Sequence, residues 1–200
     1  MSAFGWTPLN RALFGGHVNL ARFLIEHGAD VSDKIEDGRT PLHFASSHGH
    51  VDRARFLVER GADLSAKSED GSTPLHLASS HGHVDLARFL VEHGTDLSAK
   101  NEDGSTPLHL ASSHGHAPLA QILIEHGADV SAKDKYGQTP LHLALSRGYV
   151  DFARFLVEHG ADVSAETGHR CICLTAMWIL HASSSSTAQT CQLRTRTARG

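Results

Sequence analysis

The sequence predicts an all-α solenoid, in which short antiparallel helix pairs are stacked in series and joined by β-hairpin or turn loops. Two observations support this fold class. Fifteen of the 18 glycines fall at three fixed phases of a 33-residue period. A period of this length is typical of stacked repeats, because each unit buries its apolar face only against its neighbours. The tripeptide Thr-Pro-Leu recurs at the same period and is led by Thr7, Thr40, Thr73, Thr106 and Thr139.

Each repeat carries the signals for two short helices, which are clearest in residues 71–103. Thr73 can accept a hydrogen bond as an N-cap, and Pro74 suits the first helical position because its missing N–H costs nothing there. This helix should end by Gly82, which can adopt the left-handed conformation. A second helix should follow and end before Gly94, since apolar residues recur between these two glycines at spacings of three and four.

We expect one domain of five repeats, with irregular sequence at both ends. The domain spans residues 5–167, and we interpret residues 1–4 as a truncated start. Stacking is obligatory, because an isolated helix needs roughly 12–15 residues even in a favourable sequence. Between repeats, dipeptides such as Asp103-Gly104 favour a turn or short hairpin. The repeats cover residues 5–37, 38–70, 71–103, 104–136 and 137–167.

The motif G-x-T-P-L-H-x-A, followed by G-H and then G-A-D at a 33-residue period, resembles the ankyrin repeat from about Gly5 to Ala165. The resemblance implies a unit made of a hairpin and a helix pair, with the hairpin tips and first helices forming a concave surface that binds a partner. It also implies that one histidine per repeat hydrogen-bonds the backbone of the neighbouring loop, with Asn10 in its place in repeat one. These histidines are His43, His76, His109 and His142.

Residues 168–200 break the pattern, and we interpret them as a further repeat displaced into another reading frame. Met177-Trp178-Ile179 must be encoded by ATG TGG AT, and reading that run from the third base gives Val-Asp, as at Val150-Asp151. With permitted codons the displaced frame can read GYVDLARFLVEHGTDVSAKDTDG, which closely matches residues 148–165. The alternative is a disordered tail rich in serine and threonine.

Charge and cysteine usage exclude several classes of function. Residues 1–167 hold all 22 acidic residues but only 14 of the 18 basic ones, a formal charge of −8, and lack the clustered Lys and Arg that nucleic acid needs. No apolar run approaches the roughly 18 residues of a membrane span, and all three cysteines lie in the tail. We expect an intracellular monomer, cytoplasmic or nuclear, that binds a protein partner and neither nucleic acid nor membrane.

Neither the 17 histidines nor the repeated Ser-Ser-His tripeptide predicts a metal centre or an active site. Equivalent histidines of neighbouring repeats lie about 8–10 Å apart, whereas metal ligands lie about 2.0–2.1 Å from the ion. The pair Cys171-x-Cys173 is a weak metal signal, and Ser-Ser-His occurs three times whereas catalysis needs one distinct pocket. We therefore expect no enzyme activity, no cofactor and no metal. A response to pH stays open, because protonating every histidine would add 17 positive charges.

We expect the partner to contact positions that vary between repeats, at the hairpins and at the end of the first helix of repeat five. The predicted function is a non-catalytic scaffold for protein–protein interaction, with a uniform surface that favours a modest or avidity-driven contact. The alternative is the interaction arm of a larger signalling NTPase or ubiquitin-transfer protein. The candidate partner-binding residues are Lys34, Ile35, Glu36, Lys67, Ser68, Glu69, Lys100, Asn101, Glu102, Lys133, Asp134, Lys135, Tyr136, Leu145 and Arg147.

Overall fold

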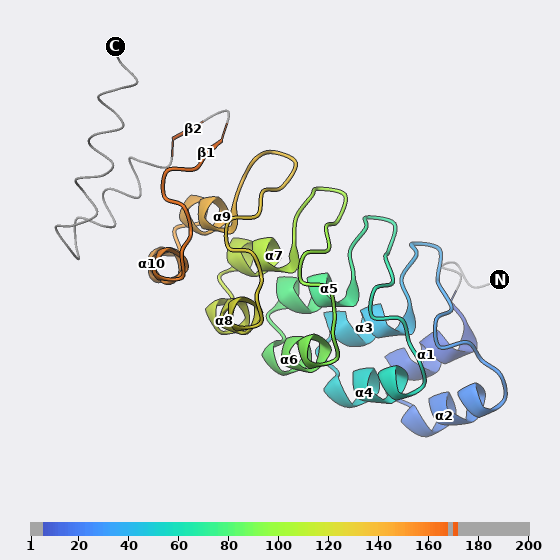
Figure 1. Ribbon diagram of the computed structural model, residues 1–200. Helices are drawn as coiled ribbons and strands as arrows, with labels where there is room; N and C mark the ends of the chain where they lie inside the picture. The colour runs from blue at the N-terminus through green and yellow to red at the C-terminus, as the bar shows by residue number, and fades with distance from the viewer. Residues whose placement is uncertain (1–5, 168–169, 172–200) are drawn as a thin grey trace, which may run out of the picture.

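The computed structural model describes residues 6–167 and 170–171, and this part of the chain contains ten α-helices and one short two-stranded sheet. The helices form consecutive pairs in two rows (Figure 1). The first helices of the pairs are α1 (Pro8–Phe14), α3 (Pro41–Ser47), α5 (Pro74–His81), α7 (Pro107–His114) and α9 (Pro140–Ser146). The second helices are α2 (Val18–Glu26), α4 (Val51–Glu59), α6 (Val84–Glu92), α8 (Ala117–Glu125) and α10 (Val150–Glu158).

The helix pairs stack in series, each on the next. Among the first helices, α3 packs against α5, α5 against α7 and α7 against α9, while α4 contacts α6 and α6 contacts α8 among the second helices. The loops that lead from one pair to the next all project from the same side of the stack, as Figure 1 shows. The predicted all-α solenoid of helix pairs is therefore confirmed.

Helix α5 shows why each first helix begins and ends where the sequence predicts. The Thr73 hydroxyl accepts a hydrogen bond from the backbone N–H of His76 at 3.5 Å, and the Thr73 N–H donates to Nδ1 of His76 at 3.2 Å. These bonds satisfy N–H groups at the start of the helix. Gly82 ends the helix with a φ of 72°, and a Cβ there would lie 2.6 Å from Nδ1 of His116. Both the backbone conformation and the next repeat therefore require glycine.

One apolar core runs through the whole stack. In the central repeat Leu75, Leu86 and Leu90 are completely buried. Burial of a leucine side chain stabilises a protein by about 1.5–3 kcal/mol relative to leaving it exposed. Because the same positions recur every 33 residues, the repeats share this stabilisation and depend on their neighbours for it.

Repeat one shows what happens when no repeat precedes a helix pair within the described residues. Leu20 is 48% exposed and Phe23 is 53% exposed, whereas the equivalent residues of repeat three, Leu86 and Phe89, are 0% and 5% exposed. Helix α6 carries Leu86 and Phe89 and contacts α4 of the preceding repeat. The difference in exposure therefore measures how much each repeat relies on the one before it.

After α10 the chain forms β1 (Glu166–Thr167) and β2 (Arg170–Cys171). These two strands pair antiparallel, with Glu166 opposite Cys171. The predicted frame-displaced repeat in residues 168–200 lies outside the described residues, apart from the backbone of β2. The predicted truncated start in residues 1–4 lies outside them as well.

Candidate protein-binding surface

The loops between repeats are tight turns with hydrogen bonds of their own. In the loop before α5, the Ser68 N–H donates to the Ser72 carbonyl at 3.0 Å, and the Gly71 N–H donates to the Ser68 carbonyl at 2.9 Å. The Asp70 carboxylate accepts a hydrogen bond from the Ser72 N–H at 3.1 Å. Aspartate favours such a turn because its side chain can bond to the backbone two residues on. The loop is therefore a defined hairpin turn with a fixed shape.

Neighbouring hairpin turns are also bonded to one another. In each case the N–H group of a residue at one tip donates to a carbonyl at the tip of the preceding repeat. These bonds fix the turns into a single row, which we name the hairpin row and define as residues 33–39, 66–72, 99–105 and 132–138. The bonds are Glu69 N–H to Asp37 O at 2.9 Å, Glu102 N–H to Asp70 O at 2.9 Å, and Lys135 N–H to Asp103 O at 3.0 Å.

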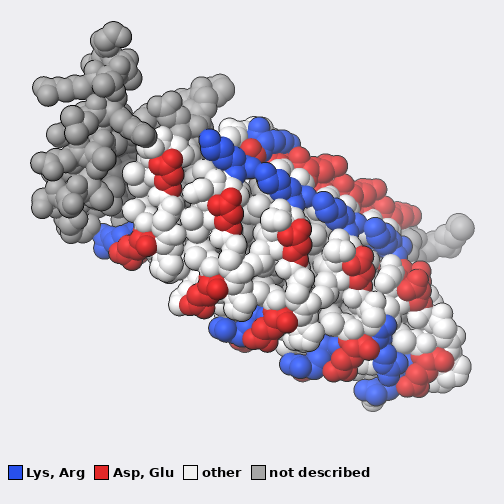
Figure 2. Space-filling model, viewed as in Figure 1, with Lys and Arg blue, Asp and Glu red and all other residues white. Residues whose placement is uncertain are grey.

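A line of lysines runs along the hairpin row. Lys34 donates from Nζ to the carbonyl of Lys67 at 3.1 Å, Lys67 to that of Lys100 at 3.0 Å, and Lys100 to that of Lys133 at 2.8 Å. Figure 2 shows basic side chains in a line on the loop side of the stack, with acidic side chains on both sides of it. Since Lys34, Lys67 and Lys100 are each bonded to the next repeat, their positive charges are held in line at the repeat spacing.

Buried histidines form hydrogen bonds to backbone carbonyls of the hairpin row, as the resemblance implied. Nδ1 of His76 accepts a hydrogen bond from the Thr73 N–H, so its Nε2 carries the proton and donates to the Ser105 carbonyl at 2.9 Å. The same arrangement joins His43 to the Ser72 carbonyl at 3.0 Å and His109 to the Gln138 carbonyl at 3.1 Å.

The predicted bond fails at His142. Its Nε2 is buried and has no hydrogen-bond partner among the described residues. The equivalent carbonyl would lie 29 residues further on, at Cys171 in β2, and β2 pairs with β1 instead. In repeat one the side chain of Asn10 is also buried without a hydrogen-bond partner in the described part of the chain.

Burial lowers the pKa of His43, His76 and His109 below the ordinary value of 6.5. The largest cause is desolvation, which disfavours the charged imidazolium, and the hydrogen bond from Nε2 to a carbonyl opposes it only in part. These side chains are therefore neutral near pH 7 and act as structural donors and acceptors.

The structure places the predicted partner-binding residues in three groups. Ile35 and Ser68, at 9% and 8% exposure, are buried, so their side chains are not available to a partner. Asn101, Asp134 and Leu145 are half-buried. The remaining candidates are exposed; they are Lys34, Glu36, Lys67, Glu69, Lys100, Glu102, Lys133, Lys135, Tyr136 and Arg147.

Each hairpin contributes a triplet of consecutive candidate residues, and in three of the four hairpins the side chain of the middle one shapes the turn. The Ser68 hydroxyl donates to the Asp70 carboxylate at 2.6 Å and to the Ser72 carbonyl at 2.9 Å. At the same position, Asn101 Oδ1 accepts from two backbone N–H groups at 3.1 and 2.9 Å, and Asp134 Oδ1 accepts from two at 2.8 Å. The first and third residues of the triplets remain to face a partner. Arg147 lies apart from the hairpin row, at the C-terminal end of α9.

An aromatic cluster that was not predicted from the sequence lies at the start of the stack. The Trp6 ring lies 5.1 Å from that of Phe14 and 5.0 Å from that of Phe44, measured between ring centroids. The signal was present in the sequence, because Phe14 stands where the other four repeats carry serine. This departure from the repeat pattern was interpreted as an irregularity at the end of the repeat array.

No group of three or more His, Cys, Asp or Glu side chains within the described residues could hold a metal ion. In the repeated Ser-Ser-His tripeptide, Ser79 is buried whereas His81 is exposed and donates from Nδ1 to the Leu77 carbonyl at 2.9 Å. In the other two copies, Ser47 and Ser113 lie 2.9 Å from Nδ1 of the adjacent histidine, but that nitrogen donates its proton to a backbone carbonyl. It therefore cannot act as the base that nucleophilic catalysis requires. In the same part of the chain, no helix is long and apolar enough to cross a membrane.

The stacked helix pairs and the bonded hairpin row define the class of protein as a helical repeat solenoid. A family model for three copies of the ankyrin repeat matches residues 1–68, 32–101, 64–134 and 94–167. These matches cover most of the chain, which therefore belongs to the ankyrin-repeat family. Ankyrin repeats generally mediate protein–protein interaction. No curated protein matches the chain at a significant level.

Proposed function

We propose that the chain is a non-catalytic scaffold that binds a protein partner through the hairpin row and the adjacent first helices. The observation that carries this proposal is the set of hydrogen bonds between successive turns, from Glu69 to Asp37 and from Glu102 to Asp70. A surface that is rigid before binding loses little conformational entropy when the partner docks. The bonded turns thus supply a preorganised array of charges.

The chemistry of the hairpin row suits a partner that makes the same contact several times. The exposed residues repeat as Lys67 and Glu69 in one turn and as Lys100 and Glu102 in the next. Exposed ion pairs contribute only about 0.2–1 kcal/mol each, so a single turn would bind weakly. A partner that spans several turns gains affinity through multivalency. We propose that the protein binds such a partner as a monomer.

Affinity capture with two matched bait proteins tests this proposal. The hairpin variant removes two positive and two negative side chains from the hairpin row, and the control variant removes the same charges from the exposed face of α4 and α6. Proteins captured from extracts of cells that express the chain are quantified for each bait. The hairpin variant carries Lys67→Ala, Glu69→Ala, Lys100→Ala and Glu102→Ala, and the control carries Arg55→Ala, Glu59→Ala, Arg88→Ala and Glu92→Ala.

We expect the partner to be depleted from the hairpin variant and retained by the control. Both variants keep the formal charge of the wild type, so a change in net charge cannot explain a difference between them. Equal capture by all three baits would show that the hairpin row is not the binding surface.

A further inference from the structure

The junction between repeats one and two carries a cluster of aromatic rings. Besides the contacts of Trp6 with Phe14 and Phe44, the Phe14 ring lies 5.7 Å from that of His48. Phe14 is 56% exposed, although it belongs to the cluster. Exposed aromatic side chains that rest on a packed cluster are the residues that most often dominate binding energy at protein interfaces.

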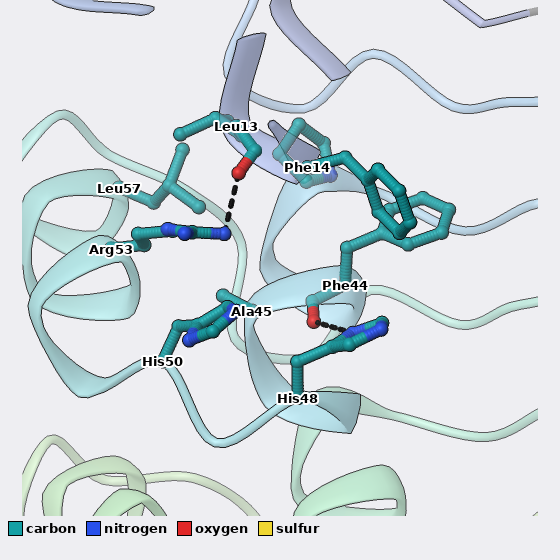
Figure 3. A pocket seen from close by; sticks show the side chains of 9 residues that line it. Leu13, Phe14, Phe44, Ala45, His48, His50, Arg53 and Leu57 are labelled. Atoms are coloured by element: carbon teal, nitrogen blue, oxygen red, sulfur yellow. Dashed lines mark hydrogen bonds between the residues drawn. The ribbon is translucent and has the colours of Figure 1, made fainter. Parts of the chain in front are cut away.

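Arg53 lies beside the aromatic rings, at a position that repeats three to five fill with a buried apolar residue. Its equivalents Leu86 and Leu119 are both 0% exposed, and Phe152 is 5% exposed. Arg53 is half-buried and donates from its guanidinium to the carbonyl of Leu13, at the end of α1, at 2.6 Å (Figure 3). This bond uses one of the five N–H donors of a guanidinium. No ion pair among the described residues involves Arg53.

Two histidines add further polar groups to the same place. The rings of His48 and His50 are stacked with centroids 5.8 Å apart. The residues equivalent to His50 in the next two repeats, His83 and His116, donate from Nε2 to carbonyls of the preceding repeat at 3.1 and 3.2 Å. His50 makes no such bond in the described part of the chain, where Arg53 bonds to the preceding helix instead.

These side chains enclose a small pocket, which Figure 3 shows with Arg53, His50 and His48 on its polar side and Phe14 and Phe44 on its aromatic side. No Asp or Glu lines the pocket. Its volume is about 20 Å³, enough for a group the size of one water molecule. A ligand must therefore lie over the aromatic rings and place only a small polar group inside. An anionic oxygen fits the charge of the lining.

We propose that this pocket anchors the partner by binding a peptide segment in which a carboxylate lies within two residues of a large apolar side chain. The inference rests on the proposed function, since it assumes a protein partner. The carboxylate accepts hydrogen bonds from Arg53, whose planar guanidinium suits carboxylate geometry. The apolar side chain covers Phe14 and Trp6. Chemical specificity then lies where repeats one and two depart from the other repeats, and the nearly uniform hairpin row adds affinity.

Arg53 also has a structural role, because its bond to Leu13 satisfies a free carbonyl at the end of α1. Substitutions taken from the chain's own repeats separate the two roles. Arg53→Leu introduces the residue that repeats three and four carry at this position, and Phe14→Ser introduces the residue that the other four repeats carry. Both variants should fold, and Phe14→Ser changes a side chain that is mostly exposed.

The experiment selects binders from a displayed library of random short peptides with the purified full chain. Selected peptides are synthesised with blocked ends and titrated by the fluorescence of Trp6, in a Trp178→Phe background that leaves Trp6 as the only tryptophan. We expect the peptides to share Asp or Glu within two residues of Phe, Leu or Trp. Changing that acid to its amide, or introducing Arg53→Leu or Phe14→Ser, should each weaken binding about tenfold or more. The control Arg55→Ala, on the same helix, should leave binding unchanged.

The inference is overturned if no peptide is selected, if the selected peptides share no acid, or if Arg53→Leu leaves their affinity unchanged. Each of these results is compatible with capture of a partner by the hairpin row, so the proposed function can survive the loss of this inference. Conversely, peptides whose affinity depends on Arg53 would support the proposed peptide-binding pocket even if the hairpin variant captured its partner as well as the wild type.

Discussion

The imidazole of His76 donates a hydrogen bond from Nε2 to the carbonyl oxygen of Ser105, 29 residues away in the chain and 2.9 Å away in space. His76 lies in the first helix of its repeat, and Ser105 lies in the hairpin loop that leads to the next. Because the same bond occurs at His43 and His109, a buried histidine joins a helix to the following hairpin loop at three of the four junctions between repeats. This relationship fixes the hairpin row to buried residues of the first helices.

Replacement of His76 tests this link. His76→Ala leaves the Ser105 carbonyl and the Thr73 N–H without their partner, and a buried polar group left unpaired costs about 1–3 kcal/mol. We expect the free energy of unfolding, measured by urea denaturation, to fall by at least about 1 kcal/mol. His81→Ala on the same helix is the control, because His81 is exposed and surface substitutions usually change stability by less than about 0.5 kcal/mol. Equal losses for the two variants would contradict the structural role of His76.

The pH dependence of stability follows from the same histidines. Burial lowers the pKa of His43, His76 and His109 below 6.5, the value that applies to the unfolded chain. As the pH falls below 6.5, the unfolded chain binds protons that the folded chain does not, so the free energy of unfolding decreases. The stabilisation is therefore fully present above the unfolded pKa and is lost on acidification towards the folded pKa. Urea denaturation between about pH 5 and 8 should show this decrease, and a constant midpoint would be inconsistent with neutral buried histidines.

The stacking of repeats predicts a large effect at Leu90, which is completely buried in the central repeat. Leu90→Ala should lower the free energy of unfolding by about 2–5 kcal/mol, since it removes buried methyl groups and leaves a cavity. Ser80 is half-buried on the first helix of the same repeat, and Ser80→Ala should cost little. Calorimetric unfolding of both variants gives the comparison. Similar costs would argue against the continuous core.

At Ser79 we expect a substitution to cause no loss of stability, because this buried polar side chain makes no hydrogen bond within the described residues. Its Oγ has no hydrogen-bond partner among the described residues, and the same holds for Ser46 and Ser112. Burying an unpaired hydroxyl is unfavourable, so Ser79→Ala should leave the melting temperature unchanged or raise it. A clear loss of stability would show that the Ser79 hydroxyl has a partner that this account lacks.

The repeated elements of the fold could be predicted because their causes lie within one repeat. Thr73 caps and Pro74 begins a helix by local bonding rules, and Gly82 ends it because its φ is positive. These signals recur every 33 residues, so the helix boundaries followed from the sequence alone. The family resemblance added the histidine bond to the next loop, which holds at three of the four predicted positions and fails at His142.

The candidate site was less predictable, because its features depend on contacts between repeats. Ile35 and Ser68 varied between repeats and were expected to face a partner, yet both are buried. Nothing within a single turn indicates that burial. The residue type of Arg53 likewise predicts an exposed charge. Its position beside the aromatic rings depends on its hydrogen bond to Leu13 of the preceding repeat. Differences from the consensus mark such positions without saying which way the side chain points.

The most direct test of the central claim is the dissociation constant of the captured partner for the hairpin variant and for the charge-matched helix control. The hairpin variant removes two lysines and two glutamates from the hairpin row, and the control removes two arginines and two glutamates from the exposed face of α4 and α6. We expect binding to be about tenfold weaker or more for the hairpin variant and unchanged for the control. An equal dissociation constant for the two variants would contradict the proposal that the hairpin row binds the partner.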